Sequence, residues 1–346
     1  MHCGKRQYDA EDEDTVFRFK AAHALAAFSD GADAAASVTV VFVPGYGQSV
    51  PHDDGAVKGL TLSLEPGVVL GIIGESGSGK STLAKLITGL EKLTSGYILF
   101  QGKSVEQWLR RDRRAFRQQC QMVFQNPFES FDPLRTISAS LMEAVGIYHR
   151  EWSPAQRRAY CCRELERYGL LPAEDILCRY PHQLSGGQLQ RVAILRAMIP
   201  EPKLLLADEA VSMLDVSVRA DVINLFGRIA REHHTAMVFI SHDILTASYL
   251  ADRMGVMFKG ELVEYGDTGT VVREPIHPYT QAMVSCCGDL SGRIDTRFLG
   301  GRSSLAQQEG GGCPYRGRCP RAQAQCSRQA PALTERQPGH FVRCAI

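Results

Sequence analysis

The chain has 346 residues, 44% of them hydrophobic, and a formal net charge of +1. Its length predicts one large domain or two, and its balanced charge gives no reason to expect nucleic acid or anionic lipid as a partner. No apolar run approaches the roughly 18–20 residues that cross a bilayer, and the acidic start does not resemble a secretory signal. Because the 11 cysteines occur without an export signal, we expect a reducing, cytosolic compartment.

The expected elements alternate between strands and helices. Residues 1–36 are acidic and then alanine-rich, which predicts a poorly ordered extension. Apolar runs predict strands at 38–42, 60–64, 68–73, 203–207 and 236–240, and Glu65-Pro66-Gly67 predicts a turn after the second. Residues 127–181 are predicted to be helical, with a start signal at Ser153-Pro154. The pattern predicts an α/β fold with an inserted helical subdomain, and the changed composition after about 288 predicts a separate small element.

A glycine-rich segment follows the expected strand 68–73 and precedes a helical pattern. It matches the phosphate-binding P-loop at every fixed position. Lys80 is expected to neutralise the β and γ phosphates of ATP, and the Ser81 hydroxyl to bind Mg²⁺. A Gly/Ser-rich surface loop is the alternative, but the strand, Lys80 and Ser81 in register argue against it. The candidate ATP-binding residues of this segment are Gly74, Glu75, Ser76, Gly77, Ser78, Gly79, Lys80, Ser81 and Thr82.

Two acidic residues follow the expected buried strand 203–207. Asp208 is expected to hold Mg²⁺ at the carboxyl edge of the sheet, and Glu209 to polarise the attacking water. Two adjacent acids can instead cap a helix, but the P-loop upstream favours the catalytic interpretation.

A second candidate anion site lies further along the chain. Ser185, Gly186, Gly187 and Gln188 precede an amphipathic pattern, as at an anion-binding helix N-terminus. Because the chain already has a P-loop, a second phosphate-binding segment suggests a site completed across a dimer interface. The sequence LSGGQ at this position resembles the signature of ATP-binding cassette (ABC) ATPases.

Other motifs of that family follow in order, and the resemblance implies their roles. Gln125 matches the glutamine that senses Mg²⁺ and the attacking water, and would join Ser81 and Asp208 around the ion. Asp215 lies in a segment that resembles the D-loop, and His242 matches the switch histidine that contacts the γ-phosphate. The adenine ring would stack on an early aromatic residue. Phe42 is the candidate and Tyr46 the alternative, and either can instead serve ordinary packing.

The resemblance narrows to the ATPase subunits of dipeptide, oligopeptide and nickel importers. It is carried by residues 122–137, 184–198, 208–225 and 273–283, and it extends over about 38–346. It implies a RecA-like P-loop ATPase core with an antiparallel β subdomain over 37–287, a helical subdomain over about 126–190, and a C-terminal extension over 288–346. Ala210 departs from the proline of most members and is shared with nickel-type and some oligosaccharide-type relatives, so the substrate stays open.

The resemblance also implies partners and a location. Two cassettes would close around two ATP molecules, the second being a paralogous ATPase subunit or another copy of this chain. Two integral membrane permease subunits, and indirectly an extracytoplasmic solute-binding protein, complete such an importer at the cytoplasmic face of the plasma membrane. Rival interpretations are a soluble ABC ATPase not engaged in transport and an accessory protein of phosphonate degradation.

Four cysteines lie near the C-terminus. Cys313, Cys319, Cys326 and Cys344 do not have the C-x₂-C spacing of common zinc modules. The segment resembles the cysteine-bearing extension of peptide-importer ATPases, some of which hold a [4Fe–4S] cluster. A cluster, a zinc ion and unligated thiols are three alternatives that the sequence leaves open.

Overall fold

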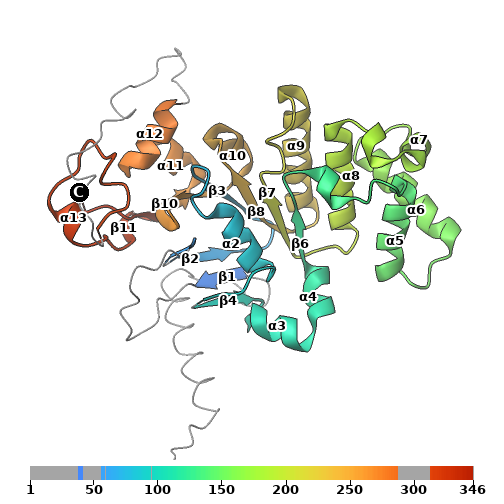
Figure 1. The fold of residues 1–346 in the computed structure, drawn as a ribbon, viewed down its shortest axis with the longest axis horizontal. Coiled ribbons are helices and arrows are strands. Elements are labelled where there is room, and N and C mark those ends of the chain that lie inside the picture. Colours follow the sequence, from blue (N-terminus) through green and yellow to red (C-terminus); the bar gives the residue numbers. More distant parts are fainter. Residues whose placement is uncertain (1–37, 42–55, 59, 95, 287–311, 346) are drawn as a thin grey trace, which may run out of the picture.

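The computed structural model describes residues 38–41, 56–58, 60–94, 96–286 and 312–345. Within these ranges an eight-stranded sheet runs through the molecule, and a four-stranded sheet lies beside it (Figure 1). The expected extension over 1–36 lies outside the described residues. No helix in the described part is long and apolar enough to cross a membrane.

The larger sheet has the order β11-β12-β10-β9-β3-β8-β7-β6, and the five strands from β9 to the β6 edge are parallel. Every residue of β3, β7 and β8 is buried, as expected for continuous apolar runs covered on both faces. The register pairs Ile73 with Ser241 and Asp208 with Ile240. The carboxyl ends of β3, β7 and β8 therefore meet at one edge of the sheet. The parallel strands are β3 (Val69–Ile73), β6 (Cys120–Val123), β7 (Leu204–Asp208), β8 (Ala236–Ser241) and β9 (Arg253–Phe258).

The C-terminal extension continues this sheet. β10 (Glu261–Asp267) pairs antiparallel with β9, β12 (His340–Val342) pairs with β10, and β11 (Thr334–Gln337) forms the edge. The sequence predicted a separate small element here. The structure shows instead that the last two strands belong to the central sheet.

The smaller sheet is antiparallel and has the order β2-β1-β4-β5. It consists of β1 (Val38–Val41), β2 (Thr61–Leu64), β4 (Tyr97–Phe100) and β5 (Lys103–Ser104). The predicted turn after β2 is present: Val68 N–H donates to Glu65 O over 3.2 Å, and Gly67 has φ of 74°. Pro followed by a positive-φ Gly is the pattern of a type II turn.

Helix α2 (Lys80–Ile87) connects the two sheets. Leu83 and Ala84 of α2 are fully buried in one hydrophobic cluster with Leu62 of β2 and Ile240 of β8. This packing fixes the start of α2 against the carboxyl ends of the parallel strands.

The helical subdomain forms one end of the molecule (Figure 1, green). Ser153 caps α6 in a capping box with Gln156, and Pro154 is its first residue, so the predicted start is confirmed. The subdomain contains the short 3₁₀ helices η1 (Pro127–Ser130) and η2 (Pro181–Gln183), and α5 (Ile137–Tyr148), α6 (Pro154–Arg167), α7 (Ala173–Cys178) and α8 (Gly186–Met198).

The remaining helices pack around the sheets. They are α3 (Val105–Arg111), α4 (Arg113–Gln119), α9 (Val216–Glu232), α10 (Ile244–Leu250), α11 (Thr268–Arg273), α12 (Pro278–Cys286) and α13 (Gln325–Arg328).

Candidate nucleotide site

The P-loop connects the end of β3 to the start of α2. Gly79 is the N-cap of α2, with φ of 99°, and a Cβ there would lie 2.0 Å from Ala56 O. Only glycine fits such a backbone. Gly260 N–H donates to Ser78 O over 2.9 Å and so joins the loop to the turn between β9 and β10. The free N–H groups of the first turn of α2 are suited to an anion.

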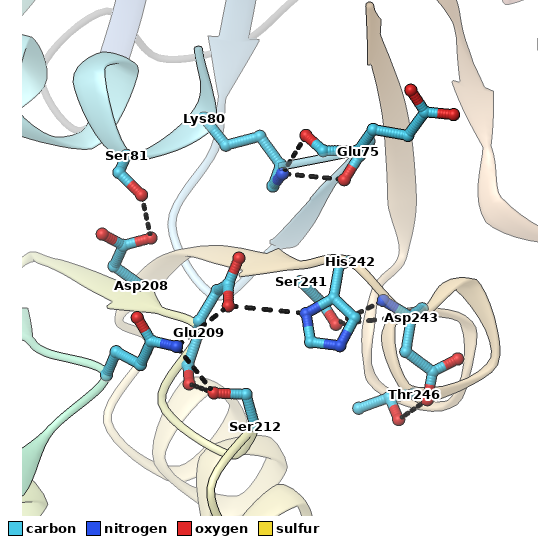
Figure 2. A network of polar contacts seen from close by, with 12 residues as sticks. Glu75, Lys80, Ser81, Asp208, Glu209, Ser212, Ser241, His242, Asp243 and Thr246 are labelled. Carbon is cyan, nitrogen blue, oxygen red and sulfur yellow. Dashed lines mark hydrogen bonds and ion pairs between the residues drawn. The ribbon is translucent and has the colours of Figure 1, made fainter. Parts of the chain in front are cut away.

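Lys80 lies inside this loop, with only 4% of its surface exposed. Its Nζ donates to Gly74 O over 2.7 Å and to Glu75 O over 2.9 Å (Figure 2). Burial lowers the pKa of Lys80, and the carboxylates of Glu209, Asp208 and Glu75 oppose this shift. The ammonium group is therefore held at the centre of the loop, where the sequence predicted phosphate binding.

Ser81 and Asp208 meet across the start of α2 and the end of β7. Ser81 Oγ donates to Asp208 Oδ1 over 3.0 Å (Figure 2). Burial raises the pKa of Asp208, and the neighbouring Glu209 adds to this, whereas the bond from Ser81 lowers it. A hydroxyl and one carboxylate beside a phosphate site form the kind of oxygen donor set that Mg²⁺ uses in nucleotide sites. The residues present fit the expected ion.

Glu209 has a strained backbone, with φ of 47°. A non-glycine residue in the left-handed region costs energy, and such residues concentrate at functional sites. The carboxylate lies between two other predicted residues. Gln125 Nε2 donates to Glu209 Oε2 over 3.2 Å, and His242 Nδ1 lies 3.4 Å from the same oxygen. The structure thus brings Glu209, His242 and Gln125 into contact.

The amide of Gln125 is directed at Glu209 and not at the Ser81–Asp208 pair. Its Nε2 also donates to Ser212 Oγ over 3.3 Å, and Ser212 Oγ donates to Glu209 O over 2.9 Å. The role of Gln125 in binding Mg²⁺ stays a prediction. Ser212, the first residue of the segment that resembles the D-loop, had no predicted role, and the structure places it within this cluster.

The signature segment forms the predicted helix N-terminus. Ser185 Oγ accepts from Gln188 N–H over 3.2 Å, and Gln188 Oε1 accepts from Ser185 N–H over 3.0 Å. Gly187 packs against α9, where a Cβ would lie 2.2 Å from Val218 Cγ1. Figure 1 shows α8 within the helical subdomain and apart from α2. The two segments of one chain that are predicted to bind phosphate are thus separate.

Asp215 is exposed at the N-cap position of α9, and its side chain makes no capping hydrogen bond. Phe42, the candidate for stacking on adenine, and Tyr46 both lie outside the described residues.

Comparisons with known proteins agree with this geometry. Residues 57–212 match the family model described as ABC transporter, and residues 263–326 match the oligopeptide/dipeptide transporter C-terminal region. The oligopeptide transport ATP-binding protein OppF of Escherichia coli is 40% identical over 84% of this chain and 87% of its own length. AppF of Bacillus subtilis, also described as an oligopeptide transport ATP-binding protein, is 38% identical over 84% of this chain and 89% of its own length.

The chain belongs to the ABC transporter family of ATP-binding proteins. This ABC ATPase also resembles solved cassettes. A Clostridium perfringens protein of an ABC transporter complex has a TM-score of 0.59, with 28% identity over 68% of this chain and 90% of its own. A dimeric ATP-binding cassette in a post-hydrolysis state, bound to ADP and phosphate, has a TM-score of 0.57, with 28% identity over 67% of this chain and 98% of its own. The expected fold class and ATPase activity are confirmed.

The four tail cysteines of the ABC ATPase lie in one neighbourhood. Burial, and to a smaller extent the nearby Cys326, Cys319 and Cys344, raise the pKa of the Cys313 thiol to about 11. Among the residues that the structure describes, however, no group of three or more His, Cys, Asp or Glu side chains is placed to hold a metal ion. The thiols do not form a ligand set in this arrangement, so neither the [4Fe–4S] cluster nor the zinc ion, two of the three alternatives that the sequence left open, finds support here.

Two contacts of the P-loop were not foreseen. Tyr279 Oη accepts from Glu75 N–H over 2.9 Å, and Arg318 donates to both oxygens of the Glu75 carboxylate. Arg318 belongs to the C-terminal extension and has no local sequence signal. Tyr279 lies in one of the segments that carried the family resemblance, but its position beside the P-loop depends on the tertiary fold.

Proposed function

We propose that this ABC ATPase energises the uptake of oligopeptides through separate membrane permease subunits. Two observations support the substrate class: the match of residues 263–326 to the oligopeptide/dipeptide transporter region, and relatives named as oligopeptide transport proteins. In the structure this region is continuous with the cassette, because β10 pairs with β9 and Arg318 contacts the P-loop. The observation that carries the proposal is this combination of a nucleotide site with a peptide-transporter extension built onto it.

The residues at the carboxyl edge of the sheet fit ATP hydrolysis. We assign phosphate binding to Lys80 and the N–H groups of the first turn of α2, and binding of Mg²⁺ to Ser81 and Asp208. Mg²⁺, when bound, neutralises charge on the phosphates. Glu209 would accept a hydrogen bond from the attacking water and so orient it towards the γ-phosphate. Gln125 and His242 hold the Glu209 carboxylate in place, and His242 is also the candidate for contact with the γ-phosphate.

Two cassettes are needed for a complete site in this proposal. Ser185, Gly186 and Gly187 at the start of α8 would face the phosphates bound to the P-loop of the other cassette. The partner would be a paralogous ATPase subunit or a second copy of this chain. Because ATP bridges the two halves only when they are closed, binding favours the closed state and hydrolysis removes the bridge.

Membrane subunits would convert this closure into transport. We place the ATPase at the cytoplasmic face of the plasma membrane, on two permease subunits that receive peptide from a solute-binding protein. Ala210 after Glu209 keeps nickel and oligosaccharide uptake as alternative cargoes, and ATP hydrolysis outside any transporter as the alternative of another class.

The test is reconstitution of the ATPase with its permeases, second cassette and solute-binding protein in vesicles. ATP-dependent accumulation of labelled oligopeptides, lost in Lys80→Ala, is the expected result. Accumulation of a nickel chelate or an oligosaccharide, with no peptide uptake, would contradict the substrate class. Failure of the chain to associate with any permease pair, with ATP hydrolysis intact, would contradict the transport role.

A further inference from the structure

The P-loop carries a carboxylate that the phosphate-binding pattern does not require. Glu75 occupies one of the variable positions of the motif, five residues before Lys80. Glu75 and Lys80 interact electrostatically. A negative charge at this place opposes the binding of a polyphosphate, because like charges separated by a few ångström repel strongly when partly shielded from water.

The structure pairs this carboxylate with a residue far away in the sequence. Arg318 Nη2 and Nη1 donate to the two carboxylate oxygens of Glu75 over 2.7 and 2.8 Å, across 243 positions. Figure 2 shows the Glu75 carboxylate directed away from the ammonium of Lys80, while the main-chain oxygen of Glu75 faces it. The hydrogen bond from Arg318 lowers the pKa of Glu75, so the carboxylate is charged at neutral pH.

Aromatic rings hold the guanidinium in place. The Arg318 guanidinium lies 5.5 Å from the ring centroid of Tyr315 and 5.8 Å from that of Phe258. The hydroxyl of Tyr279 accepts a hydrogen bond from the N–H of Glu75. The ring of Tyr279 packs on both of these rings, with its centroid 5.4 Å from that of Tyr315 and 4.7 Å from that of Phe258. Both the backbone and the side chain of Glu75 are therefore fixed by residues beyond the nucleotide-binding motifs.

We propose that Arg318 is a positioning residue for ATP binding. It neutralises Glu75 and keeps its carboxylate on the far side of the loop from the phosphates, so the C-terminal extension sets the ATP affinity of the P-loop. The inference concerns nucleotide binding by this chain alone and does not depend on what the transporter carries.

An ordinary surface ion pair is the competing explanation. Side chains of Glu75 and Arg318 are 47% and 50% exposed, and pairs of this kind contribute little to folding stability. Both explanations therefore predict that Arg318→Ala leaves the thermal unfolding midpoint nearly unchanged. They differ in ATP affinity, which only a positioning role alters.

The experiment measures the ATP affinity of the full-length chain by calorimetry in two backgrounds. Arg318→Ala should weaken binding about tenfold when Glu75 is present, equivalent to about 1.4 kcal/mol. In the Glu75→Gln background, Arg318→Ala should weaken ATP binding by less than about threefold, because no carboxylate is left to repel the phosphates. Arg318→Lys keeps the positive charge and loses only the paired hydrogen bonds of the guanidinium, so it should retain most of the ATP affinity.

A matched control lies in the same extension. Arg321 donates to Gln281 Oε1 over 2.6 Å and to Ile276 O over 3.2 Å. Arg321→Ala removes an equivalent charge from a residue that makes these contacts and none to the P-loop in the hydrogen bonds above. The ATP affinity of this variant should stay within about twofold of wild type in both backgrounds.

Ionic strength gives a second readout. Raising salt from about 0.05 M to about 0.5 M should narrow the gap between Arg318→Ala and wild type, because screening weakens the repulsion. The proposal is overturned if Arg318→Ala binds ATP like wild type, or if its loss of affinity is the same in both backgrounds. Failure of peptide transport would leave it untouched, since the test requires no permease.

Discussion

Asp208 and Glu209 are adjacent in the chain but have different surroundings. Asp208 is the last residue of β7, with 8% of its surface exposed, and accepts a bond from Ser81. Glu209 leaves the strand in a left-handed conformation and turns towards His242 and Gln125. Two carboxylates with separate partners can perform separate tasks, one in ion binding and one in orienting water.

The raised pKa of Asp208 leads to a prediction on stability. Burial disfavours the charged form of Asp208 and so raises its pKa above the ordinary value of 3.8. As the pH rises from 3.8 through the raised pKa, the unfolded chain loses this proton more readily than the folded protein does, and the folded state is destabilised. This cost persists at neutral pH. Asp208→Asn should therefore raise the urea midpoint at pH 7 and abolish ATP hydrolysis. The stability gain should shrink as the pH is lowered towards 3.8.

The control is Asp175→Asn, a change of an exposed aspartate in α7. It should alter neither the urea midpoint nor hydrolysis appreciably. A lower midpoint for Asp208→Asn than for wild type at pH 7 would show that burial is not the dominant influence on this carboxylate.

Among the elements, continuous apolar runs were the strongest guide. They predicted β3, β7 and β8 because each strand is buried on both faces. β11 could not be predicted in this way, because all of its residues are polar and exposed. β12 has only three residues and owes its place to pairing with β10, which is a tertiary effect.

A buried polar cluster attaches the extension to the cassette. His340 Nε2 lies 2.7 Å from Glu264 Oε1, and both side chains are fully buried. Glu264 also accepts from the N–H groups of Ile276 and His277. Burial lowers the pKa of His277 to about 4, and its Nδ1 accepts from Tyr279 N–H, which connects this cluster to the residue beside the P-loop.

His340→Ala tests this attachment. Leaving Glu264 without one of its buried partners should destabilise the protein by about 1–3 kcal/mol. Hydrogen exchange should show the loss first in β12 and β10, while β7 and β8 keep most of their protection. Gln337→Ala on the exposed β11 is the control and should have little effect. Unchanged exchange in β12 for His340→Ala would contradict the role of the cluster.

At the scale of the molecule, the order of the motifs predicted a site shared between two chains. α8 lies in the helical subdomain and apart from α2, which agrees with that expectation (Figure 1). The sequence also predicted most residues of the candidate nucleotide site, because the family motifs have fixed spacing. It could not predict Arg318, since contacts between segments 243 residues apart depend on the complete fold.

Ser185→Arg tests the shared site. A bulky cation at the exposed start of α8 should leave ATP binding by the isolated chain nearly intact, because its P-loop is unchanged. It should abolish ATP-driven association with the partner cassette, measured by sedimentation. Lys80→Ala provides the contrast, since it should impair ATP binding itself. Loss of ATP binding in isolated Ser185→Arg, comparable to that of Lys80→Ala, would contradict the two-chain arrangement.

The central claim is that this chain hydrolyses ATP through Glu209. The most direct measurement is phosphate release by the assembled transporter with the partner's site inactivated, for Glu209→Gln against Glu201→Gln. Glu201 is a matched control, because it is exposed, precedes β7 and also has a positive φ of 52°. Glu209→Gln should retain ATP binding and slow hydrolysis at least about 100-fold, while Glu201→Gln stays close to wild type. Hydrolysis by Glu209→Gln at a rate near wild type would contradict the account.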